Sequence, residues 1–229
     1  MKLIRAVMAV GCAAALSCAA VLIGPAPASA VAMLQLNDHV NPIVTIVDGG
    51  AGDACLVAGC VTFNGAIGPT ATWFVNVSTG LNLSTFPLDL SSVNGSNAAG
   101  TLDIAFGDVD FSQGPGPHNI DVASLIGGTT SGQVRWHSGI NDSNINPVTA
   151  CCDQTGALYG PAGPGAFSQT NVDHYNADGT FALGLFVTIT HGGAGVTSFD
   201  YEGKVPEPAT LLLMGFGLLT VGALRRRNR

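Results

Sequence analysis

The chain has 229 residues, of which 47% are hydrophobic and only 10% are charged. Six of its eight Lys and Arg residues lie at the two ends, so residues 31–204 hold only Arg135 and Lys204 against fourteen Asp and Glu residues, a net charge of −12. Such an acidic region repels phosphate backbones, which argues against nucleic acid as a partner. Its 174 residues suffice for one domain with a hydrophobic core.

Residues 1–30 have the pattern of a secretory signal peptide. Lys2 and Arg5 give a positive start, residues 6–24 are largely apolar, and Ala28-Ser29-Ala30 supplies the small residues of a cleavage site. We therefore expect the secretion machinery to export the chain, with cleavage after the last alanine of this triplet.

The exported region has a β composition, rich in Gly, Thr, Ser and Asn and poor in the charged residues of helix surfaces. The clearest predicted strand is 181–190, where every second residue from Phe181 to Ile189 is apolar and Phe186 falls on the other side of the alternation. Further strands are predicted at 33–36, 43–47, 61–63, 70–77, 88–90, 102–106, 120–125, 133–137 and 196–201. Short strands separated by Gly, Pro, Asn and Asp predict an all-β fold, an antiparallel β-sandwich, with no helix outside the targeting segments.

No linker divides residues 31–204, so we expect a single domain between the two targeting segments. The Gly- and Pro-rich segments 113–117 and 160–165 are predicted to be loops at its ends. Asn176-Ala177-Asp178-Gly179 is predicted to be the turn before the clearest strand.

Four cysteines, Cys55, Cys60, Cys151 and Cys152, lie in the exported region. Behind a secretion signal an even count indicates disulfides, here with three connectivities. We favour bridges between the two pairs, since each would close a long loop and contribute roughly 3–5 kcal/mol. The alternatives are a local Cys55–Cys60 bridge and a four-Cys metal site, the latter disfavoured because adjacent cysteines fit one tetrahedron poorly. Cys18, in the signal segment, raises the alternative of a lipoprotein signal, but the residues before it fit a lipobox poorly.

The five histidines are scattered, and none belongs to a recognisable catalytic or metal-binding motif. We expect each of them to be a loop or surface residue. They are His39, His118, His137, His174 and His191. The chain also lacks a Gly-x-Ser-x-Gly elbow and a phosphate-binding loop, so we expect no cofactor and no catalytic centre of these kinds.

Three acidic residues, Asp103, Asp108 and Asp110, cluster in the segment 102–111. Carboxylates on loops are the ligands that calcium prefers, so these three are weak calcium candidates, although acidic turns on secreted domains are usually only solvated. As an alternative, Asp108 and Asp110 would serve as the general acid and base of a polysaccharide hydrolase.

Aromatic side chains on the surface would provide stacking platforms for sugars. The candidates are Trp73, Trp136, Tyr159 and Tyr175. Both tryptophans lie in alternating strands, so we expect them to pack in the core. For ice binding a regular array of threonines would be expected, and the sequence contains no such repeat.

The last twenty-five residues form a second targeting segment with three zones. Val205-Pro206-Glu207-Pro208 is a stiff, extended spacer, because proline cannot continue a helix or a ladder of hydrogen bonds. Residues 209–224 form an uncharged run of 16 residues, about 24 Å long as a helix at ~1.5 Å per residue. That is a little short of the hydrocarbon core of about 30 Å. The cluster Arg225-Arg226-Arg227-Asn228-Arg229 would stay on the cytoplasmic side.

This segment, residues 205–229, resembles the PEP-CTERM sorting signal of Gram-negative bacteria, which some family naming also calls an ice-binding protein C-terminal region. The resemblance implies a transient hold in the inner membrane, processing by an exosortase and a setting in which extracellular polysaccharide is common. The alternative is an ordinary single-pass anchor that is never cleaved.

From these observations we expect an exported, non-catalytic protein of the cell surface or extracellular matrix, associated with exopolysaccharide. A secreted carbohydrate-binding module and a polysaccharide hydrolase are the alternatives.

Overall fold

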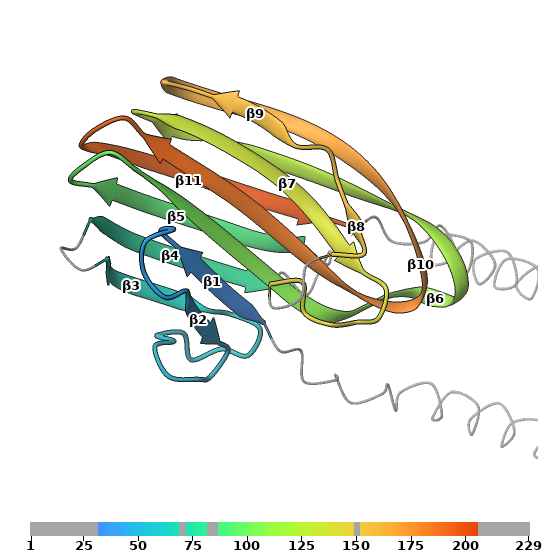
Figure 1. Ribbon diagram of the computed structural model, residues 1–229. Coiled ribbons are helices and arrows are strands. Elements are labelled where there is room, and N and C mark those ends of the chain that lie inside the picture. The colour runs from blue at the N-terminus through green and yellow to red at the C-terminus, as the bar shows by residue number, and fades with distance from the viewer. Residues whose placement is uncertain (1–31, 69–71, 82–86, 149–151, 206–229) are drawn as a thin grey trace, which may run out of the picture. The chain divides into compact units, whose positions relative to one another are not determined.

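A computed structural model describes residues 32–68, 72–81, 87–148 and 152–205 (Figure 1). The predicted signal peptide with Ala28 and Ala30, Cys151, and the sorting segment from Pro206, Glu207 and Pro208 onward lie outside these residues. Within the described ranges, no helix is long and apolar enough to cross a membrane.

The described residues form eleven strands, and every pairing between them is antiparallel. In chain order they are β1 (Met33–Asn37), β2 (Val44–Val47), β3 (Thr62–Ile67), β4 (Trp73–Leu81), β5 (Pro87–Ser96), β6 (Gly100–Thr130), β7 (Gln133–Asn141), β8 (Gln154–Thr155), β9 (Tyr159–Ala162), β10 (Gly165–His191) and β11 (Gly195–Lys204). The predicted all-β, antiparallel fold is confirmed.

The long strands β6 and β10 pair along almost their whole length, and Figure 1 shows them bending together. Because of this bend, each contributes to two layers of one continuous sheet. The first layer has the order β2-β1-β6-β10-β7, with the first part of β6, the second part of β10, and β8 and β9 on the edge. The second layer has the order β3-β4-β5-β11-β6-β10, with the other parts of the two long strands.

The inner faces of the two layers pack against each other and form the core. Gly203 of β11 illustrates the close approach, since a Cβ atom there would lie 2.7 Å from the side chain of Leu185 on β10. At one end of the core, the rings of Trp73 and His191 lie 5.0 Å apart between their centroids. The largest buried side chains are Trp73, Trp136, Tyr201, Phe106, Phe181 and Phe199.

The structure corrects several predicted element boundaries. Segments 102–106 and 120–125 belong to one strand, because 113–117 lies within β6 instead of forming a loop. The predicted turn 176–179 likewise lies within β10, where the pairing with β6 changes register between Asp178 and Thr180. The first part of β10 was not predicted, because its inward positions include the polar residues Asn171 and Asp173, which hide the apolar alternation.

Candidate functional site

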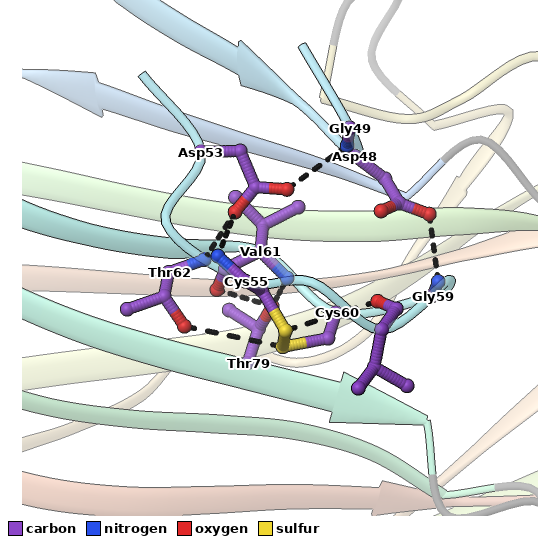
Figure 2. Close-up of a disulfide and its surroundings, with 10 residues drawn as sticks. Asp48, Gly49, Asp53, Cys55, Gly59, Cys60, Val61, Thr62 and Thr79 are labelled. Carbon is purple, nitrogen blue, oxygen red and sulfur yellow. Dashed lines mark hydrogen bonds between the residues drawn. A yellow bond between two sulfur atoms is a disulfide. The ribbon is translucent and has the colours of Figure 1, made fainter. Parts of the chain in front are cut away.

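The loop between β2 and β3 is closed by a disulfide between Cys55 and Cys60 (Figure 2). The predicted cross-bridging of the two cysteine pairs is therefore wrong, and the local bridge is the one that forms. Sequence separation favoured the long loops, but the chain turns back within five residues, so these two sulfurs lie within bonding distance. Cys152 is half-buried beside β7, where a Cβ atom at Gly139 would lie 2.4 Å from its sulfur.

The acidic residues of this loop hold its backbone. Figure 2 shows the carboxylate of Asp53 accepting hydrogen bonds from the backbone N–H groups of Gly49, Cys55 and Thr62, at 2.9, 2.8 and 2.9 Å. Burial of Asp53 tends to raise its pKa, but these three donors outweigh that effect and lower the pKa below its usual value. Asp48 accepts a hydrogen bond from the N–H of Gly59 at 2.6 Å. Both acids therefore stabilise the backbone of the disulfide loop through hydrogen bonds.

The three calcium candidates do not share one site. Asp103 faces outward from β6 and bonds to Thr188, whereas Asp108 is only 1% exposed. Asp110 is exposed, has a left-handed backbone (φ 66°) and exchanges two hydrogen bonds with Asn144. In the part of the chain that the structure describes, no three His, Cys, Asp or Glu side chains lie close enough together to hold a metal ion.

The same geometry weakens the hydrolase alternative. Glycoside hydrolysis needs two carboxyl groups about 5–10 Å apart that both reach the sugar. Asp108 is too buried for a polysaccharide to reach it, while Asp110 is exposed. Burial of Asp108, together with the nearby charges of Asp110 and Asp48, raises the pKa of Asp108 to about 7.

We expect Asp108→Asn to change the pH dependence of stability. The pKa of Asp108 is about 7 in the folded chain, whereas in the unfolded chain it has its ordinary value of 3.8. Between these values the folded chain keeps a proton that the unfolded chain has lost, so stability falls as pH rises. Asparagine does not titrate, so the stability of the variant relative to wild type should rise by about 2–3 kcal/mol between pH 5 and 8.

Thermal unfolding at pH 5, 6, 7 and 8 measures this difference. Leu56→Ala is the control, since it removes a fully exposed side chain that carries no titratable group, and its stability relative to wild type should stay nearly constant with pH. A stability difference between Asp108→Asn and wild type that does not change with pH would contradict a raised pKa of the Asp108 carboxyl in the folded chain.

The outer face of the first layer carries a pocket of about 240 Å³. Its floor is Ala105 on β6, which lies in register with Gln35 on β1 and with Phe186 on β10. The small floor residue leaves a space between the Phe186 ring and the Gln35 amide. The polar residues Asn37, Asp103 and Thr188 border one end of this space, and Pro147 and Val148 border the other.

Pro147 and Val148 can lie over the sheet because two outward positions beneath them are glycines. A Cβ atom at Gly184 would lie 2.8 Å from Pro147, and one at Gly107 would lie 3.1 Å from Val148. Neither position has room for a larger residue. The segment after β7 is thereby held against the sheet and closes one end of the pocket.

Asp103 is the only carboxylate that lines the pocket within the described residues. One of its oxygens accepts a hydrogen bond from the Thr188 hydroxyl at 2.7 Å, and the other lies 2.8 Å from Nε2 of His39. His39 reaches it from the loop after β1, where the residue adopts a left-handed backbone (φ 61°) and its N–H bonds to Asn37. These contacts fix the carboxylate in place, with acceptor capacity left toward the pocket.

Phe186 is held by His137 on the neighbouring strand β7. The two rings are stacked, with centroids 4.7 Å apart and planes inclined by 8°. Burial lowers the pKa of His137, so its imidazole is neutral at neutral pH. Because His137 covers one face of Phe186, the side toward Ala105 borders the pocket.

Three of the four aromatic residues that the sequence offered as sugar platforms are buried. Trp73, Trp136 and Tyr175 are 1–2% exposed, which confirms the expected core packing of both tryptophans. Tyr159 is half-buried and donates a hydrogen bond to Asp173 at 2.8 Å.

The expectation that every histidine is a loop or surface residue is wrong for His191, which is 3% exposed. Its ring nitrogens bond to the hydroxyls of Ser96 and Thr197, at 2.6 and 2.8 Å. Burial lowers the pKa of His191, so these neutral partners match a neutral ring. His174, by contrast, is exposed and pairs with Asp121.

Comparison with known sequences explains the end of the chain. The model of the PEP-CTERM protein-sorting motif matches residues 204–227. The chain carries a PEP-CTERM sorting motif. This motif indicates an exported protein sorted to the cell envelope and implies processing by an exosortase, a membrane protein. The predicted motif residues Val205, Pro206, Glu207 and Pro208 all fall within the match.

Outside this motif, the chain is distantly similar to several solved structures. No curated protein sequence matches it. Among solved structures, it is similar to the enzymatically active domain of tailspike protein 4 from bacteriophage CBA120 (12% identity over 58% of this chain, TM-score 0.35), of which it spans only 19%.

Two further structures are similar over nearly their whole length. The C-terminal CBM6 of LamC from Zobellia galactanivorans is 10% identical, with 63% of this chain and 99% of that chain covered (TM-score 0.27). TmCBM61, solved with β-1,4-galactotriose, is 7% identical, with 61% and 91% covered (TM-score 0.26). At these TM-scores the similarity assigns no ligand or reaction to this chain.

Sequence reasoning placed Phe186 on the non-core side of its strand but did not identify it as part of a site. Its neighbours in the pocket, Gln35, Asn37 and His137, also went unnoticed as site residues. A signal was present, because an aromatic residue among Gly184, Thr188 and Thr190 on an outward face has no core to fill. The strand order that brings these residues together is not encoded in any local motif.

Proposed function

We propose that this protein is an exported, non-catalytic component of the cell surface or extracellular matrix that binds a neutral exopolysaccharide. The binding site is the pocket over β1, β6, β10 and β7. The exosortase-dependent tail would hold the precursor in the inner membrane of a Gram-negative cell before release to the surface. The folded domain would comprise residues 31–204.

The observation that carries this proposal is the arrangement around Ala105. The Phe186 ring offers an apolar surface of the kind that packs against the C–H face of a sugar ring. The amide of Gln35, the Asp103 carboxylate and the Thr188 hydroxyl surround the same space with donors and acceptors for sugar hydroxyls. A few convergent polar groups beside an aromatic wall are typical of small-ligand sites.

The charge of the domain favours a neutral glycan. With a net charge of −12 over residues 31–204, the domain repels polymers of uronic acids or sulfated sugars. Asp103 places a further negative charge within the pocket itself. Neutral sugars carry no such penalty.

The pocket also supports a non-catalytic role. Glycosidases use two carboxyl groups about 5–10 Å apart on either side of the scissile bond. The described lining of this pocket supplies one carboxyl group, that of Asp103. One of its oxygens contacts Thr188 and the other contacts His39.

We expect Phe186→Ala to weaken glycan binding by about tenfold or more, equivalent to about 1.4 kcal/mol. The reason is loss of the apolar wall against which the sugar would stack. Affinity electrophoresis in gels containing neutral polysaccharides (dextran, β-1,3-glucan or β-1,4-galactan) measures the change.

The matched control is Leu56→Ala, which removes a fully exposed apolar side chain from the disulfide loop. It should migrate as the wild type does. Equal retardation of wild type and Phe186→Ala in every retarding gel would show that the pocket is not the site. Absence of any retardation of the wild type would contradict glycan binding itself.

A further inference from the structure

A second aromatic residue, Phe74 of β4, lies on the outer face of the second layer and is 55% exposed. Its partners in register are small: Ala66 on β3 and Gly95 on β5. A Cβ atom built at Gly95 would meet no atom closer than 3.9 Å, so the sheet beside the ring is open. The Phe74 side chain therefore has free space on the sheet to both sides.

The surroundings of Phe74 are apolar and uncharged. Val93 and Val196 are 52% and 58% exposed, and Val196 is paired with Gly95. Next to Phe74 along the sheet, the exposed residues Asn64 and Asn76 lie in register with each other. The residues Ala66, Phe74, Val93, Gly95 and Val196, with Asn64 and Asn76, are called the Phe74 patch below.

The acidic residues of this face lie outside the patch. Asp89, Asp200 and Glu202 occupy positions farther along β5 and β11, away from the Gly95–Val196 pair. A charge-free patch on a domain of net charge −12 does not match a cationic partner, whereas it matches a neutral one.

Phe74 and Phe186 face in opposite directions. Trp73, the neighbour of Phe74, points into the core, where its ring lies 5.0 Å from that of His191. Leu185, the neighbour of Phe186, points into the core toward Gly203. Since successive side chains of a strand alternate between faces, the two phenylalanines lie on the two outer faces of the domain.

We propose that the Phe74 patch is a second binding surface for a neutral glycan, so that one domain holds two polysaccharide chains, one on each face. This proposal rests on the proposed function and extends it from binding to cross-linking. An aromatic ring with open sheet on both sides and two amides beside it offers an apolar stacking surface next to hydrogen-bonding groups, as the pocket does, but without the carboxylate that the pocket contains.

A sandwich assay separates the two sites. Dextran, β-1,3-glucan or β-1,4-galactan is immobilised, the full-length protein in detergent is bound to it, and the same polysaccharide with a fluorescent label is added. We expect the wild type and Leu56→Ala to capture the label. Phe74→Ala should still bind the immobilised glycan but capture at least tenfold less label, and Phe74→Tyr should restore the capture.

Each other outcome is decisive. If the wild type binds no immobilised glycan, the proposed function fails. If the wild type binds and Phe74→Ala captures as much label as wild type, the proposed function stands and the second surface is refuted. If sedimentation shows a wild-type dimer that Phe74→Ala converts to a monomer, the patch is a self-association surface and the proposal is again refuted.

Discussion

Replacing Trp73 by alanine is expected to lower the free energy of unfolding by about 3–5 kcal/mol. Trp73 is 1% exposed and fills the end of the core where the two layers meet, against the buried ring of His191. Its Nε1 atom would lie 3.3 Å from a Cβ atom at Gly100, so the indole packs closely against this glycine. Removing the indole leaves a cavity. The His191 ring cannot easily move to fill it, because hydrogen bonds to Ser96 and Thr197 hold the ring in place.

Urea or thermal unfolding at neutral pH measures this loss. Phe74→Ala provides a closely matched control, because it truncates an aromatic residue at the adjacent position of the same strand, on the exposed face. It should change stability by only about 0.5 kcal/mol. Similar losses for the two variants would contradict the assignment of inner and outer faces on β4.

Changing Pro206, Glu207 and Pro208 together to alanine is expected to abolish release of the protein to the cell surface. The three residues open the PEP-CTERM motif, which implies recognition by an exosortase. Alanines also permit a continuous helix where two prolines disfavour it, so the extended spacer expected from the sequence would be lost. The variant should accumulate in the membrane fraction.

Comparing the intact masses of the surface and membrane fractions measures this effect. The surface form of the wild type should lack the apolar segment and the arginine cluster, and Asn228→Ala, in the same tail, should be processed like wild type. Surface protein that still carries residues 211–229 would contradict processing and leave a plain membrane anchor.

The fold class was predictable because alternation survives in the strands that bury one apolar face. The alternation of apolar residues in Phe181–Thr190 correctly predicted a strand in the central part of the sheet. Most other predicted segments fall inside observed strands. The long strands β6 and β10 were not predictable as units, since Gly- and Pro-rich residues at 113–117 mark a bend here and not an end. A bend and a turn share the same residue types.

The disulfide and the pocket show where local patterns stop being informative. Loop entropy favours a long bridge, but Cys55 pairs with Cys60 in a loop whose backbone donates hydrogen bonds to Asp53 and Asp48. The pocket depends on the neighbourhood of Ala105, whose partners Gln35 and Phe186 come from distant parts of the sequence. Only the register of three strands brings them together.

The most direct test of the glycan-binding pocket is an NMR titration of the isotope-labelled protein with a neutral oligosaccharide from the polysaccharide that gives the strongest retardation. If the pocket binds the sugar, the amide signals of Gln35, Asp103, Ala105, Phe186 and Thr188 should shift together with one saturable dependence on ligand concentration. Saturable shifts elsewhere in the domain, with these five signals unmoved, would contradict binding at the pocket.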